Sequence, residues 1–181
     1  MNDLKLTPAD LIEFMKQNAV PGEILHLSVP TPTVETAAQA VKTTPERIVK
    51  SILFLVDQNP VLAISCGLAH VDRRAIAHRY QVSRKRVKLA GPEPVLHITG
   101  YDVGALPPFG HLVPLPTLLD QRVLEHPFVY AGGGAENALV RLNPQDILRV
   151  SRAQVIDLQQ SLPSDTNDRI AGQHPDEPLI D

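Results

Sequence analysis

The chain has 181 residues, 43% of them hydrophobic and 20% charged, a balance typical of a water-soluble globular protein. Cys66 is the only cysteine, which excludes a disulfide within the chain and a CxxC metal site. No apolar run reaches the length of a membrane span, and the N-terminus lacks the apolar core of a signal peptide. We therefore expect a cytoplasmic protein that does not contact a membrane.

Charge and periodicity divide the chain into a body and a tail. Residues 161–181 carry five acidic residues against one arginine, and they show no apolar period. We therefore expect a single domain over residues 1–160, followed by a polar, disordered tail over residues 161–181.

Capping residues and apolar periodicity predict the secondary structure in chain order. In the first half we expect a helix that begins at Pro8, a strand at 23–29, helices at 33–40 and 44–50, a hairpin of strands 51–56 and 61–66, and a helix at 72–81. In the second half we expect strands at 86–90, 94–99 and 112–115, a helix at 117–126, strands at 128–132 and 138–142, a helix that begins at Pro144, and a strand at 155–158. Strands this numerous do not fit a simple βαβ series. The sequence therefore predicts an α+β, or mixed α/β, domain around a curved, barrel-like mixed sheet with surrounding helices.

The segment GYDVGALPPFGH, residues 100–111, combines glycines with prolines. Because we expect it to follow a strand, Gly100 and Gly104 would bring backbone N–H donors close to a ligand. Pro107 and Pro108 would hold the loop still, as an oxyanion site requires. The alternative is a surface turn whose glycines serve only the backbone.

A second glycine-rich segment, Gly132 to Gly134 in YAGGGAEN, also follows a predicted strand. Successive N–H groups there can form a nest for an anion or a carbonyl oxygen. The alternative is a flexible hairpin connection to the next strand.

Lys50, in RIVKSILFLV, stands among apolar residues where a predicted helix meets a predicted strand. Its ammonium group could point inward and hold a carbonyl or phosphate oxygen. The alternative is a solvated lysine near a helix C-terminus, where the helix dipole favours a positive charge.

Residues 73–88 contain seven Lys or Arg residues and no acidic residue. Arg73, Arg74, Arg84, Lys85 and Arg86 are therefore candidates for contacts with the phosphates of a nucleic acid. A solvated helix face is the alternative.

Metal and nucleophile motifs are absent from the sequence. The seven histidines show no ligand spacing such as HExxH, and there is no GxSxG segment for a serine nucleophile. We therefore expect no metal site and no cofactor.

Three segments taken together resemble a known family: TVETAAQAVKTTPERIVKSILFLV, GYDVGALPPFGH and YAGGGAENALVRLNPQDILRV. In this order they are similar to the YbaK-like aminoacyl-tRNA deacylases, the free-standing relatives of the editing domain inserted in bacterial prolyl-tRNA synthetases. The likeness runs from about Thr33 to Leu158. It implies a barrel-like core and hydrolysis of the ester that joins a wrong amino acid to tRNA.

The resemblance also implies roles for single residues. The family's lysine falls on Lys50, and its Gly-x-x-x-Gly loop falls on Gly100 and Gly104, with Pro107 after it. The family's second glycine cluster falls on Gly132, Gly133 and Gly134. Phe109 and His111 would then shape the mouth of the pocket together with Pro108, although a loop-stabilising hydrogen bond is the alternative for His111.

The sequence supports two principal functional hypotheses. The first is a free-standing deacylase that acts on mischarged tRNA with a positioned water and no protein nucleophile. The second is a non-catalytic module that binds tRNA or a small molecule on the same fold; an enzyme for another small ester or phosphate is a weaker third hypothesis. Mischarged tRNA is the expected partner, and a synthetase or a second copy of this chain stays open as a protein partner.

Overall fold

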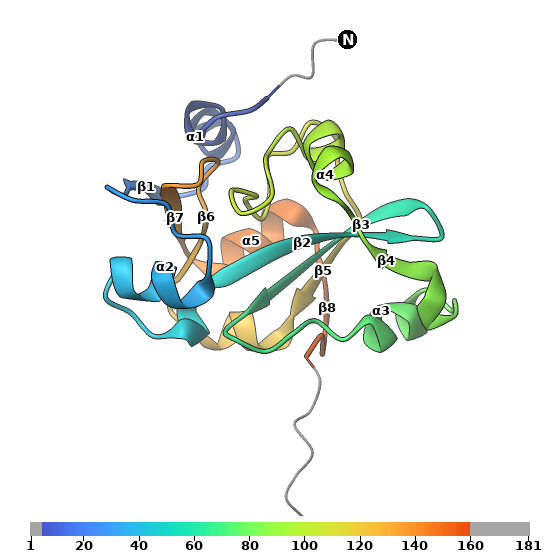
Figure 1. The fold of residues 1–181 in the computed structure, drawn as a ribbon. Coiled ribbons are helices and arrows are strands. Elements are labelled where there is room, and N and C mark those ends of the chain that lie inside the picture. Colours follow the sequence, from blue (N-terminus) through green and yellow to red (C-terminus); the bar gives the residue numbers. More distant parts are fainter. Residues whose placement is uncertain (1–4, 160–181) are drawn as a thin grey trace, which may run out of the picture.

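The computed structural model describes residues 5–159 of the chain (Figure 1). Within this range the helices are α1 (Pro8–Gln17), α2 (Val34–Ala40), α3 (Arg73–Arg79), α4 (Pro92–Thr99) and α5 (Pro144–Ser151). The strands are β1 (Gly22–His26), β2 (Val49–Val56), β3 (Asn59–Cys66), β4 (Val87–Leu89), β5 (Thr117–Asp120), β6 (Val129–Gly132), β7 (Ala138–Leu142) and β8 (Gln154–Ile156). Short 3₁₀ helices occupy Pro45–Arg47, Arg84–Arg86 and Gln121–Glu125. The expected tail, residues 161–181, lies outside the described residues, so the division into domain and tail stays a prediction.

The larger sheet has the strand order β4-β2-β3-β5-β8. β2 and β3 form an antiparallel hairpin, and the residues between them, Asp57 and Gln58, have φ angles of 52° and 70°. Two positive φ angles are what a two-residue type I′ turn requires. β5 pairs parallel with β3, and β8 pairs parallel with β5. The predicted hairpin is confirmed, and the sheet is mixed.

The smaller sheet is antiparallel and has the order β1-β7-β6. An isolated parallel bridge joins Tyr130 of β6 to Ile48, the residue before β2. The α+β class is confirmed. The barrel-like closure is not found, because among residues 5–159 the two sheets stay separate and backbone pairing joins them only at this bridge.

Helices pack on both faces of the larger sheet. Side chains alternate along β2, so Val49 and Leu53 join the cluster that contains Val95 of α4, whereas Phe54 joins the cluster that contains Ile76 of α3. Figure 1 shows α4 and α3 on opposite sides of the β2–β3 hairpin. Consecutive residues of β2 are therefore directed into two different environments.

Residues 94–99 belong to helix α4 and not to a strand. Gly91 is the N-cap and Pro92 the first helical residue, which is a common start for a helix. Val95 and Thr99, one turn apart, are both buried. The loop over residues 100–111 therefore follows a helix, and Gly100 forms its left-handed C-cap at φ +83°.

The prediction of a helix at 117–126 is wrong for residues 117–120. Thr117–Asp120 form β5, which is buried at all four positions between β3 and β8, and the 3₁₀ helix Gln121–Glu125 follows. A strand covered on both faces has no polar alternation, so its short apolar run cannot be told from a helix. The predicted strand at 112–115 is irregular backbone.

Candidate functional site

A small cavity brings together residues from four separate parts of the chain. It has a volume of about 180 Å³, and we call it the Lys50 cavity. Its lining consists of Thr31, Pro32, Thr33, Val34, Ala37, Ile48, Val49, Lys50, Ser51, Gly104, Leu106, Gly132 and Leu139. Lys50, Gly104 and Gly132, which lie far apart in the sequence, thus meet at one place.

Lys50 is the second residue of β2, and its side chain is half-buried. Its Nζ donates a hydrogen bond to the backbone oxygen of Ala69, 2.5 Å away. Burial lowers the pKa of Lys50 from its ordinary value, and the nearby Cys66 and Glu35 act weakly in the opposite direction. An ammonium group has three N–H donors, so two remain for a substrate oxygen beside the one given to Ala69.

Gly104 and Leu106 are the residues of the 100–111 loop that line the Lys50 cavity, and Gly104 has the unusual backbone. Its φ is +90°, and a Cβ built there would meet no atom within 4 Å. Among residues 5–159 its N–H has no hydrogen-bond partner, whereas that of the next residue, Ala105, donates to Asp102. A residue with a side chain would be strained at this positive φ, so the position favours glycine. Its unpaired N–H is a donor suited to binding an oxyanion.

The glycine run of β6 packs tightly against the same loop. A Cβ on Gly132 would lie 2.5 Å from the oxygen of Leu106 and 2.9 Å from that of Ala105, so only glycine lets the two backbones approach this closely. The N–H of Gly133 donates to Ala138, and that of Gly134 donates to Ala105. The N–H of Gly134 thus ties the glycine run to the 100–111 loop, and that of Gly133 closes the connection between β6 and β7. Both N–H groups are already engaged, and substrate binding by these two residues stays a prediction.

Ser51 is a cavity residue that the sequence did not single out. Its hydroxyl oxygen is buried and has no hydrogen-bond partner among the described residues. A buried polar atom without a partner is costly, and the residue that carries it lines the Lys50 cavity. The only sequence signal was a serine that interrupts the apolar run of β2.

The remaining predicted loop residues lie elsewhere. Gly100 caps α4, where its N–H donates to Leu96 and its oxygen accepts from Leu6. Pro108, Phe109 and His111 line a second cavity of about 380 Å³ together with Phe14, Gly110, Val113, Pro114, Leu115, Thr117, Val150, Ser151 and Arg152. We call it the PPFGH cavity.

His111 has a structural contact in this second cavity. Its Nε2 lies 2.9 Å from the backbone oxygen of Pro107, and its ring meets Tyr101 edge to face. Burial lowers the pKa of His111 to about 4, so the ring is neutral at pH 7. The loop-stabilising hydrogen bond, the alternative for His111, is present. Pro107 itself is buried and lines neither cavity.

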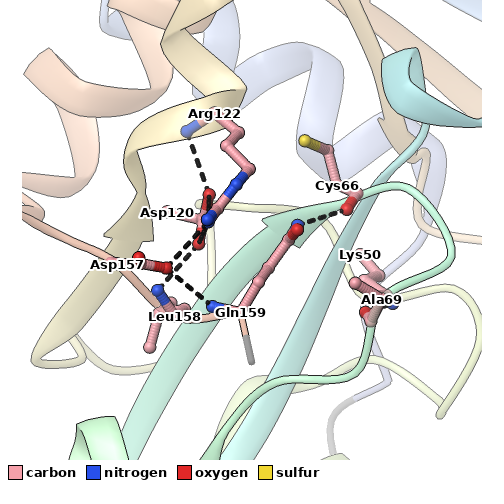
Figure 2. Close-up of polar contacts among 8 residues, drawn as sticks. All are labelled: Lys50, Cys66, Ala69, Asp120, Arg122, Asp157, Leu158 and Gln159. Carbon is pink, nitrogen blue, oxygen red and sulfur yellow. Dashed lines mark hydrogen bonds and ion pairs between the residues drawn. The ribbon is translucent and has the colours of Figure 1, made fainter. Parts of the chain in front are cut away.

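A buried polar network holds the segment that carries the acceptor of Lys50 (Figure 2). Asp120, which is fully buried, accepts from Arg122 and from the N–H of Leu158 at 2.8 Å. The side-chain amide of Gln159 then donates to the oxygen of Cys66 at 2.7 Å. Since Ala69 follows Cys66 closely, this network fixes the position of the oxygen that Lys50 binds.

Cys66 itself is an unreactive thiol. It is buried, and burial raises its pKa to about 11. Because the nucleophilic form of cysteine is the thiolate, Cys66 stays protonated near pH 7 and contributes to packing.

The basic residues of segment 73–88 are exposed but are not equivalent. Arg86 pairs with Asp57 at 3.0 Å. Arg73, Arg74, Arg84 and Lys85 have no acidic partner within residues 5–159. In the same part of the chain no group of three His, Cys, Asp or Glu residues is placed to hold a metal ion, and no helix is long and apolar enough to cross a membrane.

Comparisons with known proteins cover most of the chain. The sequence model of the aminoacyl-tRNA editing domain matches residues 28–150. The uncharacterized protein YwhH of Bacillus subtilis (strain 168) is 25% identical over 135 residues, which are 74% of this chain and 84% of YwhH.

Two solved structures are similar over nearly their whole length. A candidate trans-editing enzyme for prolyl-tRNA synthetase is 30% identical with a TM-score of 0.78, and the match covers 85% of this chain and 97% of that protein. The hypothetical protein APE2540 is 26% identical with a TM-score of 0.77, and the match covers 83% of this chain and 99% of that protein.

Proposed function

This chain belongs to the aminoacyl-tRNA editing domain family, and from this premise we propose that it is a deacylase that hydrolyses the ester of mischarged tRNA. It would act in the cytoplasm as a free-standing enzyme, on tRNA that a synthetase has released. The likeness to a candidate trans-editing enzyme over 97% of that protein supports this mode of action.

One observation supports the proposal most strongly: Lys50 and Gly104, whose N–H has no partner among residues 5–159, line the same small cavity. Attack of water on an ester carbonyl places negative charge on the carbonyl oxygen. A cation and a backbone donor fixed beforehand around that oxygen stabilise the transition state more than the ground state.

The proposed reaction needs only water and groups that the cavity holds. The water oxygen bonds to the carbonyl carbon, and the bond from that carbon to the ribose oxygen breaks. The ribose oxygen takes up a proton, which leaves a free amino acid and an intact tRNA end. No side chain of the protein forms a covalent bond with the substrate.

The cavity also indicates which amino acids would fit. A volume of about 180 Å³ has room for a small side chain, and most of its lining is apolar. Lys50 is the one charged residue in the lining, so a cationic side chain would be repelled. We therefore propose small, uncharged side chains as substrates and the exclusion of large ones by size.

The experiment is to incubate the purified protein with tRNAs that each carry a different amino acid, and to follow the loss of the ester. Rapid loss for small uncharged amino acids, and slow loss for aromatic and basic ones, is expected. A mock preparation from cells that do not express the protein, purified in parallel, shows how much hydrolysis comes from contaminating enzymes. Tight binding of charged tRNAs without hydrolysis of any of them would contradict the proposal and favour the non-catalytic module.

A further inference from the structure

A third cavity lies on the α3 side of the larger sheet. It has a volume of about 390 Å³ and is lined by Ile52, Phe54, His70, Val71, Asp72, Arg73, Arg84 and Leu89. We call it the basic groove. It lies outside the Lys50 cavity, with which it shares no lining residue.

The basic groove begins where the side chain of Lys50 ends. Lys50 and Ile52 are two positions apart on β2, so their side chains project from the same face, about 7 Å apart. The ammonium group of Lys50 binds the oxygen of Ala69, and the next residue, His70, lines the groove. Lys50 thus stands between the two cavities.

Arginine side chains outnumber the single carboxylate in the lining of the groove. Arg73 and Arg84 are exposed and have no acidic partner within the described residues. Asp72 is the one acidic residue in the lining, and its carboxylate already accepts from the backbone N–H of Arg74. By contrast, Arg86 outside the groove is neutralised by Asp57.

The floor of the groove is apolar and open to solvent at its edge. Leu89 of β4 is paired opposite Phe54 of β2, so both side chains lie on the groove face. Leu89 is 63% exposed, and Ile52 beside it is only half-buried. An apolar floor in a cavity that also carries two arginines can cover the face of a base while the arginines bind its phosphates.

From these contacts we propose that the basic groove binds the single-stranded 3′ nucleotides of the tRNA acceptor end, next to the ribose that carries the amino acid. The inference rests on the proposed function. The aminoacyl ester enters the Lys50 cavity, and the nucleotides that precede it run along the face of β2 past Lys50 into the groove. Because Lys50 lines the first cavity and its acceptor Ala69 precedes a lining residue of the second, one continuous strand can reach both sites.

The test measures binding and does not depend on hydrolysis. The probes are an uncharged RNA minihelix with the four-nucleotide single-stranded 3′ end of tRNA, and the same duplex without that end. Four variants are compared with the wild type: Arg73→Ala and Arg84→Ala in the groove, and their sequence neighbours Arg74→Ala and Lys85→Ala as matched controls. Each variant removes one exposed positive charge, so the long-range electrostatic loss is the same in all four.

We expect the wild-type protein to bind the full minihelix about tenfold more tightly than the truncated one. Arg73→Ala and Arg84→Ala should lose most of this difference, and Arg74→Ala and Lys85→Ala should keep it. Leu89→Ser should also reduce it, since the apolar floor is interrupted without a change of charge. Circular dichroism checks that each variant is folded.

The proposal is overturned if the groove and control variants behave alike, or if removal of the single-stranded end weakens all proteins equally. Hydrolysis of mischarged tRNA is measured separately on the wild-type protein. If the protein binds the minihelix as described but hydrolyses no mischarged tRNA, the groove proposal stands and the deacylase proposal is refuted. If it hydrolyses mischarged tRNA but the groove variants bind like the controls, the deacylase proposal stands and the groove proposal is refuted.

Discussion

The Lys50 cavity and the PPFGH cavity are built from the two halves of one loop but differ in chemistry. Gly104 and Leu106 line the first, together with Lys50 and with Ser51, whose buried hydroxyl has no partner among the described residues. Pro108 to His111 line the second, where Phe109 stacks on Phe14 at a ring distance of 5.7 Å and His111 is neutral at pH 7. Of the two, the first cavity presents donors that are free to bind a developing negative charge.

The difference shows that residues adjacent in a motif can serve different purposes. Leu106 lines the Lys50 cavity, whereas the residues from Pro108 onward line the PPFGH cavity with residues of α1 and α5, so the motif divides between these two positions. Substitutions in the first part should therefore change catalysis, and substitutions in the second should change stability.

Lys50→Ala should have the largest effect on activity. It removes the one charge in the lining of the Lys50 cavity and little buried surface, so the protein should stay folded. We expect deacylation to fall at least about a hundredfold, which corresponds to about 3 kcal/mol of transition-state stabilisation. Lys50→Arg should restore little, because a planar guanidinium does not replace a compact ammonium group in a small cavity. Single-turnover hydrolysis checks both variants, and a Lys50→Ala rate near that of the wild type would remove the lysine from the mechanism.

Gly132→Ala should have the largest effect on stability. Its Cβ would lie 2.5 Å from a backbone oxygen of the neighbouring loop, and backbone cannot move aside as a flexible side chain can. We expect the free energy of unfolding to fall by about 2–3 kcal/mol, measured by urea denaturation. Unchanged stability would show that the two loops are less tightly packed than the structure describes.

Gly104→Ala should reduce activity at the Lys50 cavity without disturbing the packing around it. The new methyl group meets open space, so the cost is the strain of a positive φ, about 1–2 kcal/mol. The strained backbone will relax and turn the N–H away, and we expect deacylation to fall about tenfold or more. Single-turnover hydrolysis and urea denaturation measure the two effects. A Gly104→Ala protein that is less stable but equally active would show that this N–H does not bind the oxyanion.

His111→Gln should change the pH dependence of stability and leave deacylation at pH 7 near that of the wild type. Burial lowers the pKa of His111 to about 4 in the folded chain, against about 6.5 when unfolded. Between these values the unfolded chain binds the proton and the folded chain does not, so wild-type stability falls as the pH drops from 6.5 to 4. Glutamine does not titrate, and its amide can still donate to Pro107. Urea denaturation of both proteins across this pH range should show the wild type losing stability relative to the variant. If the free energies of unfolding of the two proteins change equally with pH, His111 is not buried and neutral as described.

The sequence predicted the fold class and most elements because their signals are local. Thr33 and Asn143 accept hydrogen bonds from the helices that follow them, as their capping positions suggested. The run at 94–99 was mistaken for a strand because its β-branched residues outweighed the Gly-Pro helix start, and this error placed Gly100 at a strand end.

The site was predictable only in part, because its members meet through tertiary contacts. The sequence identifies Lys50, Gly104 and Gly132 as candidate site residues. It does not show that the N–H groups of Gly133 and Gly134 already donate hydrogen bonds within the protein. Nor could it show that Ser51 faces the cavity, since a serine in a strand has many ordinary uses.

The most direct test of the account is to fill each cavity in turn and measure single-turnover hydrolysis of one mischarged tRNA. Ala37→Leu adds bulk to the wall of the Lys50 cavity, and Val113→Phe adds bulk to the wall of the PPFGH cavity, where the side chain is already 46% exposed. Circular dichroism is measured on both variants to check that they are folded. If the aminoacyl group binds beside Lys50, Ala37→Leu will abolish most of the activity and Val113→Phe will retain it. Full activity in Ala37→Leu, or its loss only in Val113→Phe, would contradict the assignment of the Lys50 cavity as the site of hydrolysis.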